Sequence, residues 1–145
     1  MIHPISHPIE QMIALAGIVM GGVLERFKKL RVAFLESGAG WAPFLMERMD
    51  EDYGKLSHLG PYMKAKPSDY MRSGRCFFAC EPEEKTLPMV LKLVGEDQVV
   101  YASDYPHWDC LFPDSARIIY KRDDLSQAAK AKVLGENTRR LYRLA

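Results

Sequence analysis

The feature that most constrains this chain is a short apolar run that ends abruptly in an acid and a histidine. The run is Val99–Ala102, and Asp104 and His107 follow it closely. A buried strand that opens into a chemical site has this pattern, because reactive residues of parallel α/β sheets and barrels lie at the carboxyl ends of strands. A carboxylate at such a position can bind a divalent metal or act as a general base.

Two earlier apolar runs of strand length are separated from this one by helical segments. We expect strands over Leu30–Leu35, Cys76–Ala79 and Val99–Ala102. The main helices are expected over residues 8–27, 43–53 and 84–94, with shorter ones near 68 and within 112–120, 126–135 and 137–144. This alternation predicts parallel strands joined by right-handed crossovers. Residues 1–145 are therefore expected to form one α/β domain with about three parallel strands and flanking helices.

Composition argues against several classes of function. The net charge is +1 and no basic stripe occurs, so we expect no nucleic-acid partner. Three cysteines without a CxxC pair favour a reducing, cytoplasmic location over a disulfide framework. The apolar run Met12–Leu24 follows no lysine or arginine and is too short to span a bilayer, so we expect a core helix and no membrane association.

Five short segments of the chain carry recognisable motifs. They are His7-Pro8-Ile9-Glu10-Gln11, Gly21–Leu30 (GGVLERFKKL), Phe34–Trp41 (FLESGAGW), Ala102–His107 (ASDYPH) and Gly135-Glu136-Asn137. Together they resemble the amidohydrolase-related family, in the branch that contains aminocarboxymuconate-semialdehyde decarboxylase and related metal-dependent decarboxylases and hydrolases. The ASDYPH segment is similar to the family's motif after strand eight. The resemblance implies half of a TIM-type (β/α) barrel, the C-terminal half, with strands similar to the sixth, seventh and eighth.

The resemblance implies roles for the residues that follow the strands. Asp104 is expected to be a metal ligand or a proton acceptor. Glu36 stands where decarboxylases of the family carry a histidine, and it would act as a base or instead orient the Gly38–Gly40 turn. His107 would contact substrate or support Asp104, unless it is a loop histidine without such a role.

Three further residues are candidates for contacting substrate. Glu81 ends the middle strand, so we expect it at the same mouth as Glu36 and Asp104. Trp41 and Trp108 are expected either to wall a pocket or to pack in the core.

The histidines that bind metal in the family are missing from this sequence. The resemblance implies a His-x-His pair on the first barrel strand, and the sequence contains no such pair. Zinc, the expected metal, prefers three or four ligands, so Asp104 alone predicts weak or absent metal binding. The implied activity is metal-dependent hydrolysis or non-oxidative decarboxylation of a small carboxylic or cyclic substrate, with little catalysis by this chain alone.

Three hypotheses for the function remain open. The chain is the C-terminal part of such an enzyme, completed by a partner that supplies the N-terminal half-barrel. Alternatively, it is a self-associating structural or interaction module without catalysis, since an isolated piece of a barrel has open strand edges and would form a homo-oligomer. A third hypothesis is a small active metalloprotein that uses Asp104, His107, Glu36 and His7 in a new arrangement.

Overall fold

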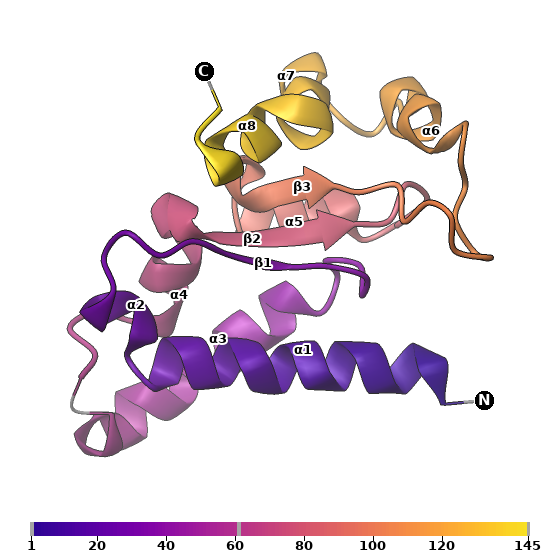
Figure 1. Cartoon of the computed structure of the whole chain (residues 1–145). Coiled ribbons are helices and arrows are strands. Elements are labelled where there is room, and N and C mark those ends of the chain that lie inside the picture. The colour runs from indigo at the N-terminus through magenta and orange to yellow at the C-terminus, as the bar shows by residue number, and fades with distance from the viewer. Residues whose placement is uncertain (1, 61, 145) are drawn as a thin grey trace.

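A computed structural model describes residues 2–60 and 62–144 of the chain, in which helices alternate with three short strands (Figure 1). The strands are β1 (Val32–Phe34), β2 (Cys76–Cys80) and β3 (Val99–Tyr101). The α-helices are α1 (His3–Met20), α2 (Val23–Arg26), α3 (Ala42–Leu56), α4 (Pro67–Tyr70), α5 (Leu87–Leu93), α6 (Ser115–Lys121), α7 (Gln127–Ala131) and α8 (Asn137–Tyr142). Short 3₁₀ turns cover Ser57–Leu59 and Glu96–Gln98, and π-helical turns cover Met71–Arg75 and Lys132–Glu136. Among the described residues, no helix combines the length and apolar character needed to cross a membrane.

The three strands form one parallel sheet in the order β1-β2-β3. Phe78 in β2 is in register with Phe34 of β1 and with Val99 of β3. All five residues of β2 are buried, as expected for a strand covered on both faces. Helices α1 and α3 lie beside β1, and α7 and α8 lie beside β3 (Figure 1). The predicted fold class, about three parallel strands with flanking helices, is confirmed.

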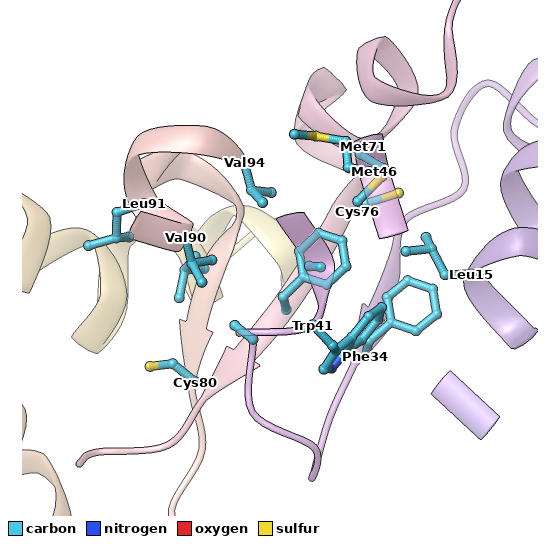
Figure 2. Packing of buried hydrophobic residues seen from close by; sticks show 14 of the residues in the cluster. Leu15, Phe34, Trp41, Met46, Met71, Cys76, Cys80, Val90, Leu91 and Val94 are labelled. Atoms are coloured by element: carbon cyan, nitrogen blue, oxygen red, sulfur yellow. The ribbon is translucent and has the colours of Figure 1, made fainter. Parts of the chain in front are cut away.

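The main core packs against the face of the sheet that carries Phe34 and Phe78 (Figure 2). The rings of Phe34 and Phe78 stack with centroids 5.6 Å apart, and Trp41 meets Phe78 edge-on at 5.7 Å. Cys76 and Cys80 lie in the same cluster, where burial raises the pKa of each thiol to about 12. These two cysteines are therefore unreactive core residues rather than nucleophiles or metal ligands.

The opposite face of the sheet is covered by the C-terminal helix. Buried residues of this second cluster are Phe77, Ala79 and Val100. Leu141 of α8 packs against them. Asn137, at the start of α8, is fully buried, and its Nδ2 donates a hydrogen bond to the Val99 carbonyl at 2.6 Å. This bond fixes α8 to β3, so this face of the sheet is not left bare.

The N-terminal helix differs from the sequence expectation at both ends. It begins at His3 rather than near Pro8, because Pro4 already occupies the first turn, where a missing N–H has no cost. It ends at Met20 because Gly22 adopts a left-handed φ of 69°, after which α2 starts in a new direction. The glycine pair therefore divides the expected helix into two.

The C-terminal helices also differ from expectation, in the opposite sense. The sequence predicts a helix end at Gly135, yet this glycine lies inside the π-helical turn that joins α7 to α8. Ser126 caps α7 as expected, since its side-chain oxygen accepts a hydrogen bond from the Ala129 N–H at 3.0 Å. A glycine within a helix is tolerated when packing holds both sides, and buried Val133 and Asn137 do so here.

Gly22→Ala is expected to destabilise the fold by about 1–3 kcal/mol, because a left-handed residue would acquire a Cβ. That atom would lie 2.5 Å from the Tyr62 Cβ. Gly54→Ala is the matched control: its Cβ meets nothing within 4 Å, and alanine in helix α3 should stabilise by up to roughly 1 kcal/mol. Urea unfolding should lower the midpoint for the first variant and raise it for the second. An unchanged midpoint for Gly22→Ala would contradict this account of the helix break.

Candidate active site at the carboxyl ends of the strands

The loops that follow the three strands enclose a hollow of about 790 Å³. Glu36 comes shortly after β1, Glu81 directly after β2 and Asp104 shortly after β3, and all three line this hollow. Parallel strands bring their carboxyl ends to one edge of the sheet, which is where such folds place their sites. The structure therefore brings the three predicted acids to one mouth.

Glu36 and Asp104 share an uncommon backbone conformation. Their φ angles are 66° and 55°, in the left-handed region that favours glycine. Holding a residue there costs on the order of 1–3 kcal/mol, less for aspartate than for glutamate. Strain of this kind is concentrated where a side chain must be presented in one direction, so it supports a functional role for both acids. Nothing in the sequence pattern signals it.

Asp104 and His107 form a hydrogen-bonded pair in the loop after β3. The backbone N–H of His107 donates to the Asp104 carbonyl at 2.9 Å, and His107 Nδ1 lies 2.8 Å from Asp104 Oδ1. The hydrogen bond to Asp104, and then the charge of that carboxylate, raise the pKa of His107. The pair therefore favours the imidazolium form of His107, which can donate a proton. Tyr105 and Phe112 brace the same loop, with ring centroids 4.6 Å apart.

Glu84 holds two of the three loops together and was missed by the sequence analysis. Its carboxylate accepts hydrogen bonds from the N–H of Ala39 at 3.0 Å, the N–H of Glu81 at 3.3 Å and the hydroxyl of Thr86 at 2.8 Å. A Cβ at Gly40 would lie only 2.8 Å from Glu84 Oε1, so glycine permits this approach. Glu84 thus holds the Gly38–Gly40 turn through Ala39.

Arg122 fixes the loop after β2 from the far end of α6. Its Nη1 donates to the carbonyl of Glu84 at 2.8 Å and to that of Pro82 at 3.1 Å. Asp124 neutralises the guanidinium through two hydrogen bonds, which raise the pKa of Arg122. The carbonyl contacts are invisible in the sequence, because the partners lie about forty residues apart.

The mouth is strongly acidic. Six carboxylates line it, from Glu36, Glu81, Glu83, Glu84, Asp104 and Asp109. Burial raises the pKa of Glu81, and the negative charges of Glu84, Asp104 and Asp109 raise it further. Glu81 therefore keeps its proton to higher pH than an ordinary glutamate, which makes it a second possible proton donor.

The two tryptophans have different positions. Trp108 lines the hollow and is 89% exposed at its rim. Trp41 is not among the residues that line the hollow, so of the two positions expected for it, the pocket wall is wrong and the core is right. It packs in the core, and its Nε1 donates to the Gly38 carbonyl at 2.9 Å. An indole whose N–H is satisfied is most stable buried, so Trp41 supports the loop after β1 from below.

The donor set of the chain does not fit a metal ion by itself. Over residues 2–60 and 62–144, no group of three or more His, Cys, Asp or Glu side chains is placed to hold one. Zinc needs three or four ligands, and Asp104 offers one carboxylate. This arrangement argues against a small metalloprotein built from Asp104, His107, Glu36 and His7.

Comparison with known proteins gives consistent results. The sequence profile of a family described as Amidohydrolase matches residues 1–144. The chain is 25% identical over 139 residues to 2-amino-3-carboxymuconate-6-semialdehyde decarboxylase from Dictyostelium discoideum, covering 92% of this chain and 36% of that protein. An amidohydrolase from Mycobacterium avium subsp. paratuberculosis K-10 has a similar structure, with a TM-score of 0.76 and 22% identity over 88% of this chain and 31% of that one.

A second solved structure gives the same result. It is 5-carboxyvanillate decarboxylase from Sphingomonas paucimobilis, with a TM-score of 0.72 and 24% identity over 88% of this chain and 38% of that one. The structural likenesses establish the fold, which is part of the barrel that these proteins have. The chain spans between 31% and 38% of the length of these three relatives.

Asp104→Asn is expected to lower the pKa of His107 toward 6.5, because the variant removes both the hydrogen-bonded carboxylate and its charge. The pKa falls in the variant because Asp104 favours the charged imidazolium of His107 in the folded protein. The favourable pairing is present at low pH and is lost as the pH rises through the folded pKa. Proton NMR titration of the histidine ring measures this directly. Asp109→Asn is the control, and a shift of equal size in that variant would contradict the pairing.

Proposed function

We propose that this chain, which belongs to the amidohydrolase family, forms the catalytic mouth of a metal-dependent enzyme that decarboxylates a small carboxylic acid. The observation that carries the proposal is the Asp104–His107 pair. Asp104 has a left-handed φ in the loop after β3, and the pair lines the same hollow as Glu81. Two relatives, from Dictyostelium and Sphingomonas, are decarboxylases, which favours this reaction over hydrolysis of a small cyclic substrate.

The proposed chemistry uses His107 as the proton donor. Non-oxidative decarboxylation breaks the bond between a carbon and its carboxylate, releases carbon dioxide and leaves an electron pair on that carbon. The carbon then takes a proton, which the His107 imidazolium would supply while Asp104 stabilises its charge. Because 62% of the His107 side chain is exposed, the imidazole would regain its proton from solvent. Glu81 is the second candidate donor, and Glu36 and Trp108 would line the substrate.

The positive charge that this reaction needs would come from outside the described residues. Six carboxylates at the mouth repel a substrate carboxylate. A divalent metal, zinc by the family resemblance, would supply the positive charge. Asp104 would be one ligand, and a second polypeptide that completes the barrel would supply the others. That polypeptide would pair with both open edges of the sheet, since β1 and β3 each pair with β2 alone in the described part of the chain. Beside β1, the flanking Leu30 and Leu35 each remain 38% exposed.

A cytoplasmic location is part of the proposal. Cys76, Cys80 and Cys110 are all free thiols, which a reducing compartment maintains.

The test mixes the full chain with the unmatched portion of the Dictyostelium decarboxylase and Zn²⁺, and follows carbon dioxide release from 2-amino-3-carboxymuconate-6-semialdehyde. We expect turnover in the mixture and none from the chain alone. His107→Gln should lower the rate by roughly 10²–10⁴-fold, the usual contribution of a positioned acid. Arg117→Gln, an exposed change on α6, is the control. An assembled mixture without turnover, or one indifferent to His107→Gln, would sink the proposal.

An interaction module without catalysis is the second candidate, and one observation favours it. Ile5, Ile9 and Ile13 form a stripe along α1 and are 59%, 47% and 61% exposed. Such a contiguous apolar helix face usually marks association.

If this stripe mediates self-association, sedimentation should detect dimers that the double variant Ile9→Lys, Ile13→Lys abolishes. Buried apolar surface drives such association, and a lysine pair on each copy would leave charges at the contact. Met89→Lys changes an equally exposed apolar residue on α5 and should leave the dimers intact. A chain that is monomeric at all concentrations would rule out the module.

A further inference from the structure

A second hollow, of about 500 Å³, lies at the amino ends of the strands, opposite the acidic mouth. Its lining includes Arg31 just before β1, Gly74 just before β2 and Asp97 just before β3. Helix α8 and the C-terminal end of the chain lie at this end of the sheet (Figure 1). Four arginines line the hollow: Arg31, Arg139, Arg140 and Arg143.

Two of these arginines are held in place from opposite sides. Arg31 Nη1 donates to the Leu141 carbonyl at 3.5 Å, and Arg143 Nη2 donates to the Lys29 carbonyl at 3.1 Å. The start of β1 and the end of α8 are therefore linked twice, because each segment contributes one arginine that donates to a carbonyl of the other. Arg143 is turned by a left-handed φ of 57° at the end of α8. A guanidinium has five N–H donors, so most donors of both groups remain available.

The acids of the hollow do not neutralise these two arginines. Asp97 is engaged by Arg140 at 2.7 Å and by Lys132 at 3.1 Å. Those hydrogen bonds lower the pKa of Asp97, so it stays ionised and committed to them. Within the described ranges, Arg31 and Arg143 contact backbone carbonyls and no carboxylate. The hollow thus holds more positive than negative charge, with Glu136 as its second acid.

We propose that this hollow binds a small phosphate monoester. Two guanidinium groups fixed by backbone carbonyls match the planar, paired recognition that phosphate oxygens favour. Leu144, which is 61% exposed, lines the same hollow, and the organic part of the ester would lie against its side chain. The site is separate from the acidic mouth and independent of the proposed reaction.

The experiment titrates glycerol 3-phosphate, and separately inorganic phosphate, into the full chain by calorimetry, with chloride used to keep ionic strength constant. We expect saturable binding with a dissociation constant on the order of 1 mM or tighter. The ester should bind more tightly than free phosphate, because only the ester reaches Leu144. Added salt should weaken both, since the arginines are partly exposed.

Arg31→Gln and Arg143→Gln should each weaken binding at least tenfold, whereas Arg117→Gln on α6 should leave it unchanged. Circular dichroism establishes that each variant is folded, and Arg31→Lys separates charge from geometry, since lysine keeps the charge but lacks the planar pair of donors. Binding that is non-saturable, or that chloride reproduces, would overturn the proposal. Binding retained in both glutamine variants would also overturn it. The proposal would also be overturned if phosphate did not bind and the arginines instead strengthened assembly with the Dictyostelium barrel portion.

Discussion

Strand β2 is the constraint on which the rest of the structure depends. Its five residues are buried, and it forms hydrogen bonds with both other strands. Its side chains alternate between two clusters, with Phe78 in the main core and Phe77 against α8. A shift of one residue would exchange these two faces, so the register is strongly specified. Because the register is fixed, the loops that follow the strands start at fixed heights and their acids converge.

Much of this arrangement could be predicted from the sequence. Apolar runs located the three strands within two residues, and strand–helix alternation predicted that they are parallel. Parallel order was then enough to expect Glu36, Glu81 and Asp104 at one mouth. Local patterns were sufficient for these features because burial on both faces leaves a visible mark in the sequence.

Features that depend on contacts between distant residues could not be predicted. The left-handed conformations of Glu36 and Asp104 arise from the loops as a whole, and neither residue type predicts them. Glu84 looks like one acid among several in Glu81–Glu84, and its contact with Ala39 requires the fold. Trp41 is equally compatible with pocket and core until its N–H partner in the Gly38 turn is known. The Gly22 break illustrates the converse, since the glycine is visible in the sequence but its φ is not.

The hydrogen bonds of Glu84 to two loops constrain which sequence changes this protein can accept. One carboxylate accepts hydrogen bonds from the loop after β1 and from the loop after β2. Insertions or substitutions in either loop would therefore alter the other loop, and their effects on the free energy of unfolding would not be additive. The loop after β3 lies outside this coupling, since Glu84 does not touch it in the described contacts. Among related sequences, the first two loops should consequently vary together in length, while the third varies on its own.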